Sequence, residues 1–526
     1  MVRLVSLLIA CGLLAGCFAP GEGVEVPQEE IYFPVGLSTD TDGSHLFVVS
    51  SDFDLKYNGG AVQSYALDEL QVMLPQTCSI DQECTKDAAK PVCGHDGLCQ
   101  SSSEDDARAC PGIGAERQPH EKLLYPTRCA PIVQRPVSSA KIGAFATDAV
   151  LRRRPDEDQD GDGNSDYPAG DPERLFIPVR GDTTLHWFDV NQGTLQCGQS
   201  RNDGACDSAH RAGQNAAKEN TRDLNLAAEP FAIDSNELGT TIVVTNQTTG
   251  TASLFVNDWS SSGPLLRFAL ASDRIPSRPV GIASLPQTDA SRVSPTPDAF
   301  LMTFRNSAQV RLVRFADDGV STPEREYLVD NGGVPIDANS VGDDSRGIAL
   351  DSSERELALA RCGEAEDGDT EADAGALKSC RDSASLVPID VYVANRAPAS
   401  LLIGRTRPPL EYPYFFQSLP LTVGPSRIVV GKVRTPSGEL ETRVFVVCFD
   451  SRRIFVYDPK RSRIEIEMLT GRGPHALAVD TERSLLYVAH FTDSFVGVFS
   501  LNLAAPASYG SMLGMLGKPK APRAAK

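Results

Sequence analysis

A pattern of three short apolar runs separated by turn residues repeats seven times along this chain of 526 residues. The clearest copy lies at residues 473–480, 485–490 and 496–501, and its runs are rich in β-branched and aromatic residues. Such runs predict strands, and their short connections predict antiparallel pairing. The other six copies begin at Pro34, Ile142, Pro230, Pro279, Arg346 and Pro425. This repetition is the strongest constraint on the fold, because a fixed period indicates a solenoid, a propeller or an array.

The spacing of the repeats selects among these architectures. From Pro425 to Pro474 the pitch is 49 residues, which suits one four-stranded blade. A fourth run follows in some copies, as at residues 464–467. The last copy lacks one, and we expect the extended stretch at residues 24–33 to supply it and close the ring. Radial closure leaves few exposed strand edges. The sequence therefore predicts an all-β fold, a seven-bladed β-propeller over residues 30–503.

Two strand sequences carry a family resemblance. Val-Tyr-Val-Ala-Asn at residues 391–395 and Leu-Tyr-Val-Ala-His at residues 486–490 resemble the YVTN-type β-propeller repeat, whose superfamily includes lactonase-like propellers. The resemblance implies a surface or periplasmic propeller. It transfers no catalytic residue to this chain, and propellers host enzymes, redox proteins and binding modules alike.

The N-terminus indicates export. Residues 1–16 combine a basic residue with a short apolar run and predict a signal peptide. The following Leu-Ala-Gly-Cys at residues 14–17 resembles a bacterial lipobox, which implies cleavage before Cys17 and a diacylglycerol on its sulfur. Phe18 in place of Asp favours the outer membrane, and residues 17–29 would form the lipidated tether. The alternative is an ordinary cleaved signal that happens to be followed by a cysteine.

Most of the remaining cysteines fall into close local groups. In an oxidising compartment such groups predict disulfides. The groups are Cys78, Cys84, Cys93 and Cys99; Cys110 with Cys129; Cys197 with Cys206; and Cys362 with Cys380. The first group allows three connectivities, and zinc is its alternative, although it lacks the short C-x2-C spacing of zinc sites. It lies in a cysteine-rich insertion at residues 75–135 that resembles segments of secreted and lipid-anchored myxobacterial proteins. Cys448, inside an apolar run, is predicted to be a buried free thiol.

An acidic insertion at residues 152–173 contains a candidate calcium loop. Its spacing D-x-D-x-D-G-x-x-D resembles thrombospondin type 3 and EF-hand-like loops, and the carboxylates are Asp158, Asp160, Asp162 and Asp166. Hard oxygen ligands at this spacing wrap one Ca²⁺, which would be a structural cofactor. Position 12 is Ala169 instead of the usual Glu. The alternative is a solvated acidic loop.

Two further segments are predicted to lack packed structure. The acidic insertion at residues 361–385 has no calcium spacing, and its glycines and alanines indicate a solvated loop bounded by a disulfide. Residues 504–526, rich in Pro, Ala and Gly and carrying several basic residues, predict a disordered basic tail.

Histidines are the candidate site residues of the ring. His475 begins a predicted strand and is the candidate for the channel mouth, where propeller ligands bind. His490 aligns with Asn246 and Asn395 of other repeats, and a polar residue there is predicted to hydrogen-bond the turn that follows. The sequence has no G-x-S-x-G elbow, H-E-x-x-H motif, P-loop or C-x-x-C-H haem motif, so no catalytic residue is assigned.

Composition limits the partners. The net charge of −20 disfavours nonspecific binding to nucleic acid, which requires a basic surface. We expect a lipid-anchored envelope propeller that acts as a non-catalytic binding or assembly scaffold, with an envelope protein or a glycan as partner. The alternative is a lactone hydrolase or lyase at the central channel, for which His475 and Asp480 are the only named residues. Carboxylate, His and Arg groups that converge on the channel would favour the enzyme.

Overall fold

The computed structural model describes most of the chain. The described residues are 23–101, 131–155, 171–198, 204–213, 225–270, 273–286, 298–316, 327–335, 344–362 and 371–520. Among them, no helix is both long enough and apolar enough to cross a membrane.

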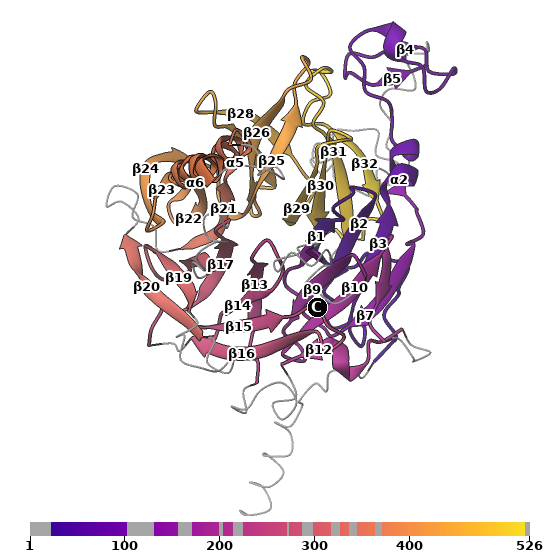
Figure 1. Ribbon diagram of the computed structural model, residues 1–526. Helices are drawn as coiled ribbons and strands as arrows, with labels where there is room; N and C mark the ends of the chain where they lie inside the picture. The colour runs from indigo at the N-terminus through magenta and orange to yellow at the C-terminus, as the bar shows by residue number, and fades with distance from the viewer. Residues whose placement is uncertain are drawn as a thin grey trace, which may run out of the picture.

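Seven antiparallel sheets stand around a central axis, as in a seven-bladed β-propeller (Figure 1). Blade 1 is β1 (Pro34–Thr39), β2 (His45–Ser50), β3 (Gly60–Ala66) and β7 (Ser138–Ile142). Blade 2 is β8 (Val150–Arg153), β9 (Glu173–Val179), β10 (Thr184–Asn191) and β11 (Thr194–Gln196), with β12 (Arg211–Ala212) also paired to β10. Blade 3 is β13 (Pro230–Ser235), β14 (Thr241–Asn246), β15 (Thr251–Asn257) and β16 (Pro264–Leu270).

The remaining blades follow in chain order. Blade 4 is β17 (Pro279–Ser284), β18 (Ala299–Phe304), β19 (Gln309–Ala316) and β20 (Tyr327–Pro335). Blade 5 is β21 (Ser345–Asp351), β22 (Asp390–Arg396), β23 (Ala399–Arg407) and β24 (Tyr412–Pro420). Blade 6 is β25 (Pro425–Arg434), β26 (Leu440–Cys448), β27 (Arg453–Asp458) and β28 (Arg463–Leu469). Blade 7 is β29 (Pro474–Asp480), β30 (Leu485–His490), β31 (Phe495–Ser500) and β32 (Met512–Leu516), with β6 (Pro131–Ile132) parallel to β32.

The hydrophobic core lies between the blades. Each of seven clusters of buried side chains draws its members from two neighbouring blades, and blade 7 shares one cluster with blade 1. The first strands of neighbouring blades contact one another around the whole ring, so these strands line the axis. The predicted fold class is therefore confirmed, with the first strand of each repeat innermost.

The ring closes differently from the prediction. The outer strand of blade 7 is β32, from the tail at residues 504–526 that was predicted to be disordered, and all of its residues are buried. The predicted closing segment at residues 24–33 forms no ladder, and Val24 makes a single bridge with Tyr57 of blade 1. The Met-Leu-Gly-Met-Leu sequence of β32 is apolar enough to cover the edge of β31.

Blade 2 begins later than its repeat predicted. Residues 142–145 were expected to form its first strand, but Ile142 ends β7, the outer strand of blade 1. The innermost strand is β8, preceded by a bridge between Ala146 and Val179. Ala146 stands where other repeats have proline, which removed the sequence signal for the start of the strand.

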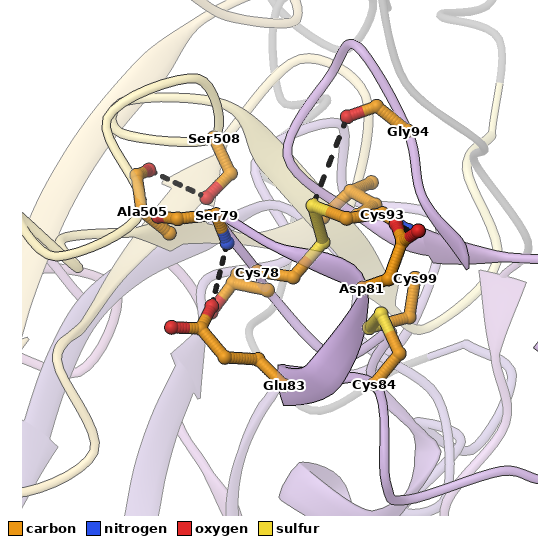
Figure 2. Close-up of a disulfide and its surroundings, with 12 residues drawn as sticks. Cys78, Ser79, Asp81, Glu83, Cys84, Cys93, Gly94, Cys99, Ala505 and Ser508 are labelled. Carbon is orange, nitrogen blue, oxygen red and sulfur yellow. Dashed lines mark hydrogen bonds between the residues drawn. A yellow bond between two sulfur atoms is a disulfide. The ribbon is translucent and has the colours of Figure 1, made fainter. Parts of the chain in front are cut away.

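The cysteine-rich segment forms a small module that projects from the ring near blade 7 (Figure 1). The strands β4 (Val92–Cys93) and β5 (Cys99–Gln100) follow the short helix η1 (Asp81–Glu83). Disulfides join Cys78 to Cys93 and Cys84 to Cys99, as Figure 2 shows. The four thiols are thus consumed in pairs, which leaves no ligand set for the zinc alternative.

Two further disulfides lie on the ring. One joins Cys197 to Cys206 in blade 2, and the other joins Cys362 to Cys380. The second ties the end of α5 (Ser353–Ala360) to α6 (Glu371–Ser385), so a helix occupies much of the insertion that was predicted to be a loop at residues 361–385. The alanines and charged residues at 371–385 form a helix readily. Ala384 of this helix is buried. Cys448 is a buried free thiol.

Candidate functional site: the central pocket

One backbone hydrogen bond recurs in all seven blades at one end of the channel. In most blades the residue after the second strand donates its N–H to the carbonyl oxygen of the residue before the first strand, with N···O distances of 2.7 to 3.1 Å over all seven blades. In blade 5 the donor is the last residue of β22, and in blade 2 the acceptor lies five residues before β8. We call the donors exit residues and the acceptors start residues. The donor and acceptor pairs, in blade order, are Ser51 and Phe33, Arg180 and Phe145, Gln247 and Glu229, Arg305 and Arg278, Arg396 and Asp344, Phe449 and Gly424, and Phe491 and Gly473. This mouth hydrogen bond fixes the rim of the channel.

Most start residues adopt a left-handed backbone. Four of them carry a side chain at positive φ, with values of 50° at Phe33, 60° at Phe145, 55° at Glu229 and 60° at Arg278. Positive φ disfavours residues with a Cβ, and such residues persist where the surroundings hold them in place. The mouth hydrogen bond supplies that restraint, and it turns the chain sharply into the first strand.

A change of strand register follows the start residue. Six first strands shift their register within three residues of their beginning, for example between Pro34 and Gly36 in blade 1 and between Pro474 and Leu477 in blade 7. A bulge of this kind redirects a side chain. The second residue after the start residue lines the channel in every blade; these lining residues are Val35, Thr147, Phe231, Val280, Arg346, Ser426 and His475.

The channel mouth holds a pocket of about 290 Å³ to which all seven blades contribute. Its large side chains are of two kinds. The phenylalanines are Phe53, Phe145, Phe231, Phe449 and Phe491. The arginines are Arg180, Arg346, Arg396 and Arg427. Within the described part of the chain, no Asp or Glu lines this pocket, and His475 is its one histidine.

Phe53 is the most exposed aromatic of the rim. Its side chain is 52% exposed, although its ring contacts Phe145 at 5.9 Å and Phe491 at 5.1 Å between centroids. Phe33 joins the same group, with its centroid 5.0 Å from that of Phe491. Of these four rings, Phe53 is the one that ranks among the exposed large hydrophobic residues of the described chain.

Each pocket arginine pairs with a carboxylate that is not itself part of the pocket lining. Arg180 pairs with Glu229 at 2.5 Å, Arg396 with Asp450 at 2.5 Å, and Arg427 with Asp148 at 2.7 Å. Arg346 donates from Nη2 to Asp344 at 2.9 Å. These pairs hold the guanidinium groups in place, and the acids themselves do not reach the pocket lining.

His475 lies in the lining, where the sequence made it a candidate. Its Nδ1 is 3.0 Å from the carbonyl oxygen of Val35. Burial, together with the charge of Arg427, lowers the pKa of His475 to about 3. The ring is therefore neutral near pH 7, and Nδ1 is the nitrogen that carries the proton, since a carbonyl oxygen can only accept.

Asp480 does not join His475. The two residues lie five positions apart on β29, which separates them by about 16 Å along an extended strand. Asp480 is buried and accepts from the hydroxyl of Tyr487 at 3.1 Å. The pair named for the enzyme alternative is therefore not brought together.

His490 lies at the strand end that the repeat alignment predicted, but it does not make the predicted hydrogen bond to the turn. Asn246 and Asn395 donate from Nδ2 to the carbonyl oxygens of Ala227 and Pro398. Within the described residues, His490 makes no side-chain hydrogen bond to its turn, and its ring stacks on Phe495 with centroids 4.2 Å apart. Burial lowers the pKa of His490 to about 4, so a neutral aromatic ring packs here.

Several predicted site residues lie outside the described residues. They are the lipidation candidate Cys17, the calcium candidates Asp158, Asp160, Asp162 and Asp166, and the cysteines Cys110 and Cys129. Sequence reasoning also missed the arginines and phenylalanines of the pocket. What most of them share is their place in the repeat, because they are start, lining or exit residues of a blade.

The chain is structurally similar to several solved proteins at low sequence identity. No protein-family model matches the chain, and no curated protein sequence matches it. Among solved structures it is similar to a protein described as a 6-phosphogluconolactonase from Bacteroides uniformis, with 12% identity over 83% of this chain and 86% of that one and a TM-score of 0.44. It is also similar to the periplasmic gluconolactonase of Pseudomonas aeruginosa, with 12% identity over 84% and 86% and a TM-score of 0.44. It is similar as well to virginiamycin B lyase of Staphylococcus aureus, with 9% identity over 89% of this chain and 94% of that one and a TM-score of 0.39.

Proposed function

We propose that the protein is a non-catalytic binding propeller whose central pocket takes a small organic ligand. The observation that carries this proposal is the lining, in which aromatic rings and arginines from all seven blades converge on one open cavity without a carboxylate among the described residues. Ligand pockets are concave and mostly apolar, with a few polar groups that orient the ligand. A neutral histidine and paired arginines suit recognition better than acid–base chemistry.

The test is a fluorescence titration with N-phenyl-1-naphthylamine, a neutral apolar dye. The protein would be the full chain with Cys17→Ser, exported so that its disulfides form. We expect saturable binding, weakened about tenfold or more by Phe53→Ser, because this exposed ring forms the apolar rim. The matched control is Phe416→Ser, an exposed phenylalanine on β24 of blade 5, which should leave binding unchanged. Absence of saturable binding by a well-folded protein would refute the proposal.

One observation favours the lactone hydrolase or lyase as a second candidate. The neutral ring of His475, protonated at Nδ1, has an unprotonated Nε2 in a pocket that also holds arginines. Such a nitrogen can accept a proton from a substrate or water. A pKa near 3 makes it a weak base, so we expect no turnover of glucono-δ-lactone above that of the His475→Asn variant. Turnover that this variant loses would make the enzyme the better proposal.

We also propose that a lipid on Cys17 holds the propeller at a membrane of the cell envelope, on the outer-membrane side if Phe18 acts as the sorting residue. Supporting this are the lipobox-like residues 14–17 and the disulfides, which suit an oxidising compartment. Labelled palmitate should enter the wild-type chain and not the Cys17→Ser variant. A crosslinked pull-down from the envelope, with and without Ca²⁺, would test for a protein or glycan partner and for a role of the acidic loop.

A further inference from the structure

The pocket has an apolar wall built by three adjacent blades. Phe53 comes from blade 1, Phe145 from blade 2 and Phe491 from blade 7. Phe53 is the centre of the group, with its ring centroid 5.9 Å from that of Phe145 and 5.1 Å from that of Phe491, and Phe33 packs beside it at 6.1 Å without lining the pocket. A cluster of aromatic rings suits contact with a flat apolar group.

A cationic wall is built by blade 5 and backed by blade 4. Arg346, the lining residue of blade 5, and Arg396, its exit residue, line the pocket, whereas Arg305, the exit residue of blade 4, lies beside them without lining it. Burial lowers the pKa of Arg346, Asp344 opposes this, and the charges of Arg305 and Arg396 lower it further. The three guanidinium groups are thus close enough to repel one another.

The carboxylates beside this wall do not balance it. Asp344 is shared between Arg346, with Nη2 at 2.9 Å, and Arg305, with Nε at 3.9 Å. Asp450 pairs with Arg396. Among the described residues, three guanidinium groups therefore face two carboxylates, and the side chain of Arg396 is still 34% exposed. A guanidinium carries five N–H donors, so Arg396 has donors to spare beyond Asp450.

The two walls face each other. Contacts between first strands run from blade 1 to blade 7 in chain order and back to blade 1, so blade 1 stands opposite blades 4 and 5 (Figure 1). The backbone of the cationic wall is fixed, because the hydroxyl of Thr303 in blade 4 donates to the carbonyl oxygen of Arg346 at 2.5 Å. At Gly281 a Cβ would lie 2.1 Å from the same oxygen, so glycine is required for this close approach.

From this arrangement we propose that the pocket selects an amphipathic organic anion, whose flat apolar body lies against the phenylalanines and whose anionic group meets Arg346 and Arg396. The inference rests on the proposed binding function and names the ligand class. Arginine binds carboxylate, sulfonate and phosphate groups through paired N–H donors, and the low polarity of the opposite wall strengthens that attraction.

Two dyes with the same ring system test whether the pocket prefers an anionic ligand. 8-Anilino-1-naphthalenesulfonate carries an anionic group that N-phenyl-1-naphthylamine lacks. We expect the anionic dye to bind about tenfold more tightly at low salt, and to lose that advantage as salt is added. Displacement of the anionic dye by 1-naphthoate and by 1-naphthyl phosphate would show which anionic group the arginines prefer.

Substitutions separate the two walls. Arg396→Gln should weaken binding of the anionic dye about fivefold or more and leave binding of the neutral dye unchanged. Phe53→Ser should weaken the binding of both dyes. Arg434→Gln, at an exposed arginine of the β25–β26 hairpin, is the matched control and should affect neither. Thermal melts would verify that the variants are folded.

The outcomes distinguish this inference from the function beneath it. If the neutral dye binds in a Phe53-dependent way but the anionic dye binds no more tightly, the proposed preference for an anion is wrong and the proposed binding function stands. An equal effect of Arg396→Gln on the binding of both dyes would also overturn the proposed preference for an anion. If neither dye binds a folded protein, the binding function itself fails.

Discussion

Arg427 and Asp148 form an ion pair across the mouth of the channel, with Nη1 and Oδ2 2.7 Å apart. They belong to blades 6 and 2, which are not neighbours in the ring, and 279 residues separate them in the sequence. Arg427 also donates from Nη2 to the carbonyl oxygen of Thr147 at 3.1 Å. The pair therefore acts as a strut between distant parts of the ring.

Removal of Arg427 should destabilise the ring in a pH-dependent way. Burial raises the pKa of Asp148 even though Arg427 opposes this, and loss of the cation would raise it further. A carboxyl whose folded-state pKa is raised favours folding at low pH and loses that contribution as pH rises through the folded pKa. Arg427→Met should therefore cost about 3 kcal/mol near pH 8 and clearly less near pH 5, as urea unfolding would measure.

The double variant Arg427→Met with Asp148→Asn is the control for that prediction. It leaves no unpaired buried charge, so most of the lost stability should return at high pH. If the single variant is equally destabilised at both pH values, the lost stability comes from packing and not from the stranded carboxylate.

Asp52 should limit stability at alkaline pH. Asp52 precedes Phe53 in the chain and has a positive φ of 50°. Its carboxylate accepts a hydrogen bond from the backbone N–H of Tyr57 at 3.1 Å. Burial, together with the charge of Asp54, raises the pKa of Asp52 to about 7. Its favourable contribution is complete below the unfolded pKa near 4 and is lost as pH rises through 7.

The variant Asp52→Asn keeps the acceptor oxygen and removes the charge. It should be more stable than the wild type by about 1 to 2 kcal/mol near pH 8, a value reduced by solvent screening, with little difference near pH 4. Unfolding curves at both pH values would measure this. A gain that does not depend on pH would mean that Asp52 does not titrate in this range.

Loss of β32 should prevent the ring from closing. A chain that ends at Gly510 lacks the outer strand of blade 7, so β31 would expose an unpaired edge beside a hydrophobic cluster. We expect it to aggregate or to melt well below the full chain. A chain that ends at Lys520 retains β32 and should melt like the full chain, as differential scanning calorimetry would show. Equal melting of the two truncated chains would contradict this role of β32.

The disulfides of the cysteine-rich module should stabilise only the module. Residues 78–99 are too few to bury a core of their own, so Cys84→Ser with Cys99→Ser should make the module sensitive to protease. The melting temperature of the ring should change by no more than about 2 °C, because Leu98 is the one residue of 78–99 in the core cluster shared by blades 7 and 1, and the ring supplies most of that cluster. A large drop would mean that the module supports blade 7.

The fold was predictable because its signal is periodic. The alternation of apolar runs located six of the seven blades, and it failed at blade 2, where Ala146 replaces proline. It also missed β32, whose single apolar run stands alone among Pro, Gly and Ala residues. The pairing of Cys78 with Cys93 depended on three-dimensional proximity that spacing leaves open.

The pocket was predictable only in part. His475 stood out because histidine is rare in this chain, whereas arginines and phenylalanines are common and gave no local signal. Their convergence depends on the ring, which brings Phe53 and Phe491 together from opposite ends of the sequence. Only the order of the blades reveals that Arg346 and Phe53 face one another.

The mouth hydrogen bond involves main-chain atoms alone, and it recurs in every blade whether the donor is Ser51, Arg180 or Phe491. The frame of the pocket is therefore indifferent to the identity of most side chains that point into it. Start, lining and exit positions can each accept new residues while the rim keeps its shape, except where glycine is required, as at the start residue Gly473, where a Cβ would lie 2.3 Å from the hydroxyl oxygen of Thr492. Such a separation of frame from lining makes the ring a scaffold on which new ligand specificities can arise by substitution at a few positions in each blade.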